Sequence, residues 1–395
     1  MGNVPTKREQ CQTCLSIAER AELRPKGNVP NLRFPEFTGE WKVERLDEIA
    51  TLSKGIGISK EQLSNNGEPC ILYGELYTKY KSEIIKEIDS RTNIDNSKLK
   101  RSKANDVIIP CSGETAIDIA TARCVPFDNI LLGGDLNIIS LYQYDGAFMS
   151  YQLNGKRKYD IAKVAQGVSV VHLYGEHLKA IITYTPCLQE QQKIAKLLSL
   201  LDERIATQNK IIDKLKSLIK GLTVTLTTKG KPNIAISQCL ECHSSTLQES
   251  EVLPNGFDKV FGANGLVGYT NTAQMNGDAI LVIKDGSGVG TVSYAQDKFS
   301  VIGTLNYLTA IGNNNLRYLY FALSVFNFQP YRTGMAIPHI YFKDYGKAKI
   351  YCPSLTEQKR VANMLGKMES KLFLEQELWA SFNSQKRYLL GQMFI

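Results

Sequence analysis

The Gly-rich loop Asp285-Gly-Ser-Gly-Val-Gly290 is the segment with the best spacing for a cofactor site, because glycine loops can cradle phosphate groups. Its glycines depart from the Gly-x-Gly-x-x-Gly pattern. The following residues, Thr291-Val-Ser-Tyr294, indicate a strand where a nucleotide site requires a helix. The sequence also contains no Gly-x4-Gly-Lys-Ser/Thr segment for ATP phosphates. We therefore interpret the loop as a tight turn and expect that this chain holds no cofactor and catalyses nothing by itself.

Cysteine and histidine residues are the next candidates, as metal ligands or nucleophiles. Two Cys-x-x-Cys pairs occur, Cys11/Cys14 and Cys239/Cys242, and His243 follows the second pair. A zinc site using both pairs would require segments about 225 residues apart to meet. Nine Cys, an odd number, and four scattered His favour reduced thiols in a cytoplasmic protein over disulfides. We expect no metal site.

Lysine and arginine supply the remaining chemistry, which is the binding of a polyanion. They outnumber Asp and Glu by 47 to 39 in 395 residues, so the formal net charge is +8. Such cations neutralise DNA phosphates, while polar side chains on loops read base edges in the major groove. The candidate DNA contacts are Lys54, Lys79, Lys98, Lys100, Arg101, Lys103, Lys156, Arg157 and Lys158 in the first half of the chain, and Lys284, Arg317 and Arg332 in the second. The alternative for each is a solvated surface charge.

Two stretches at a constant offset of 167 residues indicate how these side chains are positioned. The first contains Gly167-Val-Ser-Val-Val-His172-Leu-Tyr174, and the second contains Gly334-Met-Ala-Ile-Pro-His339-Ile-Tyr341. This period far exceeds the roughly 20–50 residues of solenoid repeats, so we infer a duplicated half-molecule. A two-fold chain suggests a two-part ligand. Because apolar residues flank His172 and His339, we expect packed, hydrogen-bonded imidazoles there rather than DNA contacts.

Short apolar runs bounded by Gly, Asn and Asp predict two similar α+β heads. Buried strands are expected at 106–110, 130–132 and 137–141 in the first head and at 278–283 in the second. Matching elements inside the heads lie at offsets of 169 and 172, so the heads share a scaffold but differ by small insertions. The predicted segments are a dispensable N-terminal extension (1–27), a first head (28–186), a central helix (187–228), a second head (229–353) and a C-terminal helix (354–395).

Each head is followed by a long helix whose apolar residues recur in steps of four and three. Such spacing is typical of a coiled-coil seam. The seam consists of Ile194, Leu198, Leu201, Ile205, Ile212, Leu215 and Ile219 in the first helix and Val361, Leu365, Met368 and Leu372 in the second. Gln208 interrupts the first seam, and Glu375 takes the same position in the second. We expect an antiparallel, pseudo-two-fold pair that separates the heads; packing of each helix on its own domain is the alternative.

The motif Pro-x-Leu-x-Glu-Gln-x-Lys/Arg-Ile/Val-Ala follows each of the two stretches and opens each long helix, beginning at Pro186 and Pro353. This motif and its helix, present twice, resemble the specificity subunit of type I restriction–modification enzymes. Two segments strengthen the resemblance, Cys70-Ile-Leu-Tyr-Gly-Glu-Leu76 and Val260-Phe-Gly-Ala-Asn-Gly-Leu-Val-Gly-Tyr269. The resemblance covers about residues 28–395, apart from a poorly matched stretch at 231–256.

The resemblance implies two target-recognition domains, each reading half of a split site in double-stranded DNA. It further implies that the helices set the spacing and dock two methyltransferase subunits, and that motor-nuclease subunits join the complex. S-adenosylmethionine, ATP and Mg are then expected in the partner subunits, and no membrane partner is expected. Glu190-Gln191 and Glu357-Gln358 could cap the helices or contact a methyltransferase, and the sequence leaves both roles open.

Two other functions compete with this interpretation. A non-catalytic coiled-coil scaffold would use the same helices but would lack sequence-selective DNA binding. An enzyme of another type would need a nucleophile–base pair in at least one head, and the residues shared by the two heads offer none.

Overall fold

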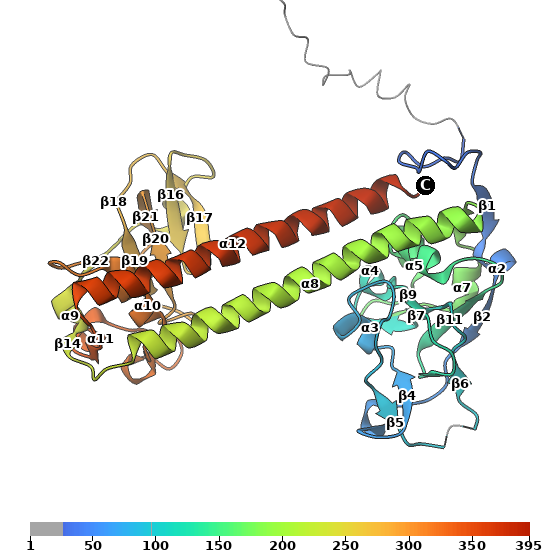
Figure 1. Cartoon of the computed structure of the whole chain (residues 1–395), viewed down its shortest axis with the longest axis horizontal. Helices are drawn as coiled ribbons and strands as arrows, with labels where there is room; N and C mark the ends of the chain where they lie inside the picture. The colour runs from blue at the N-terminus through green and yellow to red at the C-terminus, as the bar shows by residue number, and fades with distance from the viewer. Residues whose placement is uncertain (1–26, 96) are drawn as a thin grey trace, which may run out of the picture. The chain divides into compact units, whose positions relative to one another are not determined.

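The structure, a computed structural model, describes residues 27–95 and 97–395 (Figure 1). The chain forms two compact units: the first ends at Thr207 and includes Trp379–Ile395, and the second spans Gln208–Leu378. The predicted N-terminal extension, with Cys11 and Cys14, lies outside the described residues except for Gly27. Within the described ranges, no helix combines the length and apolarity that crossing a membrane requires.

The first head is built on a four-stranded antiparallel sheet. Its order is β2 (Ala50–Lys54), β11 (Leu136–Leu141), β7 (Asp106–Pro110) and β9 (Arg123–Val125). A second sheet has the order β3 (Leu63–Ser64), β5 (Arg91–Thr92), β4 (Glu68–Ile71), β10 (Leu131–Leu132) and β6 (Lys100–Arg101). Two short pairs complete the head, β1 (Lys42–Arg45) with β13 (Ile182–Thr185) and β8 (Ser112–Gly113) with β12 (Val171–His172).

The second head repeats the central sheet of the first. Its order is β15 (Leu240–Ser244), β22 (Leu305–Ala310), β19 (Ala279–Ile283) and β20 (Val292–Ala295). The other sheet has the order β17 (Gly265–Thr270), β16 (Asp258–Gly262), β21 (Lys298–Val301) and β18 (Met275–Asn276), and β14 (Ile234–Ala235) pairs with β23 (Lys349–Ile350). The smaller sheets therefore differ between the heads, whereas the central sheets match strand for strand.

Burial on both faces explains why the central strands are continuous apolar runs. In β7, Val107 and Ile109 belong to one core cluster, while Ile108 belongs to another on the opposite face. In β19 of the second head, Ile280 and Leu281 are divided between two clusters in the same way. The strands expected at 106–110, 137–141 and 278–283 are confirmed by β7, β11 and β19, as is the one at 130–132 by β10.

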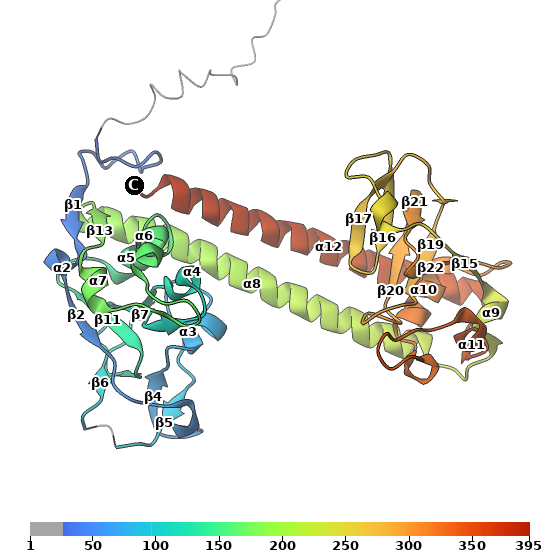
Figure 2. The ribbon, with the colours of Figure 1, turned by 180° about the vertical axis from the view of Figure 1, so that it is seen from behind.

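Short helices cover the sheets and connect the strands (Figure 2). In the first head they are α2 (Leu46–Ile49), α3 (Glu75–Thr78), α4 (Ala116–Ile119), α5 (Gly146–Asn154), α6 (Lys158–Val164), α7 (Gly175–Lys179) and a 3-10 turn at Lys60–Gln62. In the second they are α9 (Ile236–Cys239), α10 (Leu316–Ser324), α11 (Phe342–Tyr345) and 3-10 turns at Glu249–Glu251 and Gln329–Tyr331. Asp145 and Asn315 cap the N-termini of α5 and α10, so these two helices are equivalent.

The long helices are α8 (Leu188–Thr227) and α12 (Leu355–Gln392). Within the first unit, the start of α8 packs beside the end of α12, since Ile194 and Leu198 share a cluster with Met393 and Phe394. Within the second unit, the end of α8 packs near the start of α12 (Figure 1). The helices are therefore antiparallel in each unit, and the α+β class with two similar heads and two long helices is confirmed.

The seam residues divide into two kinds of contact. Ile194 and Leu198 pack on Trp41, Phe148 and Tyr151 of the first head, as well as on the other helix. Val361 and Leu365 are buried in the main core of the second head. Ile212 is buried, whereas Leu201, Ile205, Leu215, Ile219, Met368 and Leu372 are half-buried. The first turns of each long helix thus pack on a head. For these turns the alternative arrangement, in which a helix packs on a domain rather than on the other helix, is the correct one.

The polar interruption of the seam is an internal contact. The Gln208 side-chain amide donates to the backbone oxygen of Glu375 at 3.1 Å and to its carboxylate. These residues are equivalent in the repeat, since their offset is also 167. A residue that contacts its own equivalent lies at the local two-fold axis of the helix pair.

Candidate nucleic-acid interface

Each head carries a largely exposed loop, which we call the tip loop, at residues 167–171 and 334–338. In the first head the backbones of Gln166 and His172 exchange two hydrogen bonds, of 2.8 and 2.7 Å, across the base of the loop. Thr333 and His339 do the same in the second head, at 2.9 and 2.8 Å. The loops begin at Gly167 and Gly334, whose φ angles of +121° and +85° strongly favour glycine.

Apolar side chains at the tips face solvent in both heads. Val168 and its equivalent Met335 are almost completely exposed, and Val170 and Ile337 are also exposed. Single exposed apolar residues are common, but here they recur at the same two positions of a duplicated loop. The tip loops are therefore matched surfaces that a common kind of ligand could contact.

The two histidines hold the tip loop against a neighbouring turn. His172 Nδ1 lies 3.3 Å from Ser112 Oγ, and His339 Nδ1 lies 2.6 Å from Asp285 Oδ1. Both imidazoles are hydrogen-bonded, as expected, but His172 is exposed rather than packed. A short pair of strands is too small to cover its own side chains, which the apolar flanking residues did not reveal.

We call this neighbouring segment the partner turn, residues 112–114 in the first head and 285–287 in the second. Backbone pairing makes the two equivalent, because Ser112 is paired with His172 and Asp285 with His339. The Gly-rich loop that begins at Asp285 is indeed a tight turn between β19 and β20. Its role in this structure is to support the tip loop.

A cavity of about 660 Å³ lies beside the partner turn and tip loop of the first head. Helices α3 and α4, which are neighbours in both views (Figures 1 and 2), supply much of its wall. It is lined by Tyr73, Gly74, Leu76, Tyr77, Thr78, Ser112, Gly113, Glu114, Asp118, Thr121, Arg123, Ser169 and Val170. A second hollow of about 440 Å³ shares Tyr73 with it and includes Lys54. Together they form one polar, partly aromatic face.

Arg123 lines this face, and Lys158 is close enough to Arg123 for their charges to interact. Arg123 donates to the backbone oxygens of Tyr80 and Ala122, at 3.1 and 2.9 Å, and burial lowers its pKa. Burial also lowers the pKa of Lys158, and the nearby charge of Arg123 adds to this effect. The face therefore combines fixed positive charge with carboxylates and hydroxyls.

Several of the predicted DNA contacts are engaged inside the protein. Lys79 pairs with Glu75 and Asp89, and Arg101 pairs with Glu68 at 2.6 Å. Arg157 pairs with Asp160 and donates to the backbone oxygen of Ile395. Arg317 pairs with Glu369 and lies over the rings of Tyr294, Tyr320 and Phe321. These four side chains have structural contacts that the sequence pattern did not indicate.

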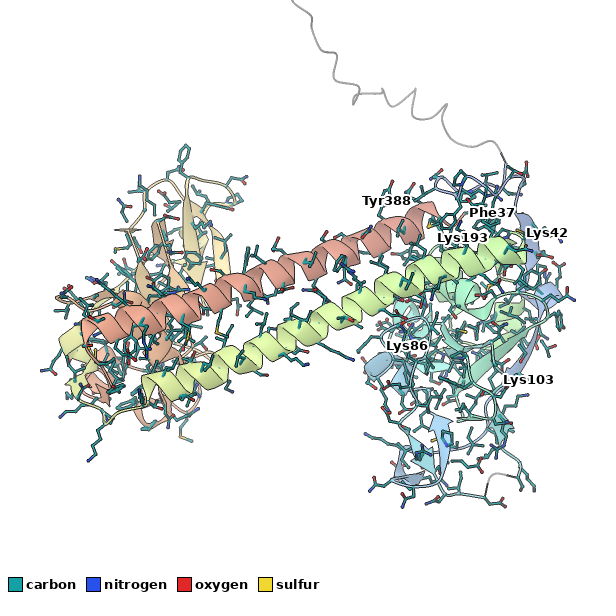
Figure 3. The ribbon with its side chains drawn as sticks, in the orientation of Figure 1. Phe37, Lys42, Lys86, Lys103, Lys193 and Tyr388 are labelled. Carbon is teal, nitrogen blue, oxygen red and sulfur yellow. The ribbon has the colours of Figure 1, made fainter. Side chains whose placement is uncertain are left out.

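The other predicted cations are more accessible. Lys54 is exposed beside the smaller hollow and lies 3.5 Å from Asp135. Lys284 is half-buried and directly precedes the partner turn of the second head. Arg332 is exposed, directly precedes Thr333 at the base of the tip loop, and donates to the backbone oxygen of Val289 at 2.6 Å. Lys98, Lys103 and Lys156 are exposed, Lys100 is half-buried, and Lys103 lies on a part of the first head remote from Lys193 on α8 (Figure 3). The structure thus brings Lys54, Lys284 and Arg332, but not Lys98–Lys103, to the faces around the tip loops.

The glutamine of each Pro-x-Leu-x-Glu-Gln motif is buried and fastens the long helix to its head. Gln191 accepts from the backbone N–H of Asp145 at 2.9 Å and donates to the carbonyl of the motif's own proline. Gln358 makes the same two contacts, with Asn315 at 2.9 Å. Because Asp145 and Asn315 are the caps of α5 and α10, these glutamines have an internal role.

The neighbouring glutamates differ. Glu190 is fully buried and pairs with Arg33 through two bonds of 2.7 Å. Glu357 is half-buried and pairs with Arg360, three positions further along the same helix. Neither glutamate is therefore an unpaired surface charge. The two glutamates are equivalent in the repeat, but the arginines that pair with them are not.

The segment Cys239–His243 has an ordinary structural environment. Burial raises the pKa of Cys239 to about 12 and that of Cys242 to about 11, so both thiols are protonated at neutral pH. His243 stacks on Tyr307, with ring centroids 4.9 Å apart, and lies 2.9 Å from Thr309 Oγ1. Across residues 27–95 and 97–395, no cluster of His, Cys, Asp and Glu could hold a metal ion.

Reasoning from sequence missed Tyr73, Glu114, Arg123 and the apolar tips. The repeat marked residues 167–174 and 334–341 as shared without saying that they are exposed, and the segment Cys70–Leu76, which contains Tyr73, carried a family resemblance without a role. The other cavity residues come from segments far apart in sequence.

The family model of the type I restriction modification DNA specificity domain matches the chain twice, over residues 38–217 and 240–380. The type I restriction enzyme MjaVIII specificity subunit of Methanocaldococcus jannaschii is 28% identical over 203 residues. That match covers 50% of this chain and 44% of the relative, so the chain matches less than half of the relative's length.

Two solved structures are similar in fold. The type I restriction–modification S subunit from M. genitalium has a TM-score of 0.68 at 18% identity, covering 93% of this chain and 99% of that one. A chain from a study of complex assembly and conformational transition of the type I R-M system has a TM-score of 0.54 at 14% identity, covering 91% and 98%. At these identities the likeness concerns the fold.

Proposed function

The chain belongs to the family of type I restriction–modification DNA specificity domains, from which we propose that it is the specificity subunit of such a complex. Each head reads one half of a bipartite site in double-stranded DNA. The observation that carries the proposal is the duplicated face, a tip loop and partner turn held by the same histidine on the same central sheet. A shared frame with different surrounding residues suits two readers of one kind of ligand.

The chain's surface supports contact with the DNA backbone and bases together. Lys54, Lys284 and Arg332 are available near the tip loops to neutralise phosphates. Exposed polar groups on the partner turns can approach base edges, which carry the sequence information in the major groove. Neither head uses a long recognition helix, so in this proposal readout comes from loops supported by strands.

We further propose that the long helices set the spacing of the half-sites and dock two methyltransferase subunits. Repeat-equivalent Ile211 and Leu378 are both exposed on these helices, as two copies of one partner would require. Motor-nuclease subunits would join the same cytoplasmic complex. Catalysis, with its S-adenosylmethionine, ATP and Mg²⁺, is assigned to those partners rather than to this chain.

Selection from a pool of randomised duplexes tests the proposal. The chain, purified with its methyltransferase partner, should enrich one bipartite sequence at physiological salt and should bind either half alone much more weakly. A duplex with a scrambled sequence is the control, because phosphate contacts alone give salt-dependent binding without selectivity. Equal affinity for scrambled DNA would favour the coiled-coil scaffold instead.

The ruler function has its own test. Insertion of one heptad into both α8 and α12 should lengthen the spacer between the half-sites while leaving each half unchanged, because a heptad preserves the side-chain register. Selection with the same randomised pool measures the spacer directly. An unchanged spacer would show that the helices do not set the half-site spacing. The proposal that the heads read DNA would be unaffected.

A further inference from the structure

The partner turns of the two heads end in different side chains. Strand pairing aligns Ser112 with Asp285, and Glu114 and Ser287 each lie two residues further along the chain. Glu114 and Ser287 are both exposed. The turns diverge after the paired residue, because Gly286 has a φ of +97° and Gly113 has no positive φ. At the second residue after the pairing, the first head therefore presents a carboxylate and the second a hydroxyl.

The backbone around Glu114 is held firmly. The Tyr77 hydroxyl donates to the Ser112 carbonyl at 2.9 Å, and β8 pairs with β12 on the other side. Gly113 fits closely, because an added Cβ would lie 2.9 Å from the Tyr77 hydroxyl and 3.3 Å from Ile119 Cβ. A side chain carried on such a backbone is suited to reading a ligand, since little backbone order is lost on binding.

The carboxylate of Glu114 is also uncommitted. It makes no hydrogen bond or ion pair within the described residues, although it lines the 660 Å³ cavity. Asp118, on the same cavity wall, is occupied by the Thr115 hydroxyl, which donates to it at 2.6 Å. Glu114 is therefore the cavity carboxylate that remains available to a ligand, beside the tip-loop residues Ser169 and Val170.

Charge limits what this carboxylate can accept from DNA. An ionised carboxylate is an acceptor only, so phosphates repel it and base carbonyl or ring-nitrogen acceptors offer it nothing. The donors that the major groove presents are the exocyclic amino groups, N6 of adenine and N4 of cytosine. Arg123, on the same cavity, can offset the repulsion of nearby phosphates.

We propose that Glu114 is a specificity-determining residue of the first head, accepting a hydrogen bond from the exocyclic amino group of an adenine or cytosine in its half-site. Ser287 is the second residue after the pairing in the second head, where a hydroxyl can both donate and accept and does not select for an amino group. This inference rests on the proposed function, because it requires that the heads read DNA.

Duplex selection with variants tests the role of Glu114. The Glu114→Ala variant should lose preference at one position of one half-site by on the order of tenfold, while the other half-site remains intact. Continued selection at the remaining positions of the same half-site shows that the first head of the variant is folded. The matched control is Glu87→Gln, which removes another exposed carboxylate of the first head that does not line the cavity.

Base analogues identify the donor. Purine in place of adenine, or 2-pyrimidinone in place of cytosine, removes only the amino group at the affected position. The unaltered chain should bind one of these duplexes about tenfold more weakly, and Glu114→Ala should bind the normal and analogue duplexes equally.

The outcomes separate this inference from the proposed function. A bipartite sequence that Glu114→Ala leaves unchanged would overturn the role of Glu114 and leave the proposed function standing. Absence of any selected sequence with the unaltered chain would overturn both.

Discussion

In the first head the partner turn ends in Glu114 beside a large cavity, whereas in the second it ends in Ser287. The histidines, tip loops and central sheets that hold the two turns are the same. The difference shows that the duplicated chain has kept the central sheet and the histidine contact and has changed the turn that follows them. Such a division is expected of two readers whose ligands share a form but differ in sequence.

The anchors between heads and long helices show the same division. Asp202 and Glu369 are equivalent in the repeat, and each accepts a hydrogen bond from a tyrosine of its own head, at 2.7 and 3.1 Å. In the first unit Lys386 lies 2.6 Å from Glu83 and 2.7 Å from Asp202, with all three side chains at least 85% buried. In the second unit Glu369 pairs with Arg317, and both are about 30% exposed.

Removing these cations should have the largest effect and should sharpen the contrast. We expect Lys386→Met to lower the opening free energy of the first unit by about 3–5 kcal/mol, because it leaves buried carboxylates without a partner. Arg317→Met should cost the second unit only about 1–2 kcal/mol, since its pair is partly solvated. Hydrogen exchange, resolved by peptide, measures each unit separately. Equal losses would show that burial does not distinguish the two anchors.

The Lys386→Met variant should also respond to pH. Burial raises the pKa of Glu83, a carboxyl whose ordinary value is 4.5, and Lys386 opposes that rise. A raised carboxyl pKa means that the folded state binds a proton more tightly, so stability falls as pH rises above 4.5. We therefore expect the deficit of the variant relative to the unaltered chain to shrink as pH is lowered toward 4.5. A deficit independent of pH would exclude Glu83 as its cause.

Gln191 and Gln358 make the same two main contacts in the two units, so their removal should have similar effects. Gln191→Ala and Gln358→Ala each remove these two hydrogen bonds and leave a cap N–H unpaired, so each should cost its own unit about 2–3 kcal/mol. Gln358 also donates to Cys352 Sγ at 3.2 Å, a weaker bond to sulfur. Peptide-resolved hydrogen exchange again measures the loss. Gln192→Ala, an exposed neighbour on α8, is the control. Unequal losses would mean that the conserved motif supports the two heads differently.

Substitution of a tip-loop glycine should weaken binding to one half of the DNA site and leave binding to the other half unchanged. Alanine at Gly167 or Gly334 must adopt a positive φ, and its Cβ would collide with the carbonyl oxygen of Val170 or Ile337. We expect about a tenfold loss of affinity for the half-site of the altered head, measured by titration with duplexes that carry each half. Gly221→Ala, in an open position on α8, should have no effect.

The smallest expected effect concerns the helices. Ile211→Asp and Leu378→Asp place a charge at equivalent exposed apolar positions, and each should weaken association with the methyltransferase subunit by about tenfold. Sedimentation of the mixed proteins gives the stoichiometry, and one bound subunit in place of two is expected for each single variant. Ser217→Asp, also exposed on α8, is the control. Unchanged association would show that the methyltransferase docks elsewhere on the chain.

Sequence reasoning succeeded where a pattern depends on neighbours along the chain. The runs 106–110 and 278–283 predicted strands because both faces are buried and every residue after the leading aspartate is therefore apolar. It was less informative for single cations. Arg157 and Arg317 resemble other surface charges in sequence, yet their guanidinium groups have internal partners from segments more than 50 residues away.

The sequence by itself determined the duplication, the α+β heads, the long helices and the equivalence of Gln208 with Glu375, because these follow from periodicity and a constant offset. Only the tertiary structure decided which shared residues face inward and which face solvent. It buried Gln191 and Gln358, exposed Val168 and Met335, and placed Glu114 in a cavity. The physical reason is that exposure depends on contacts between distant segments, and a repeat records which residues are shared without recording what they touch.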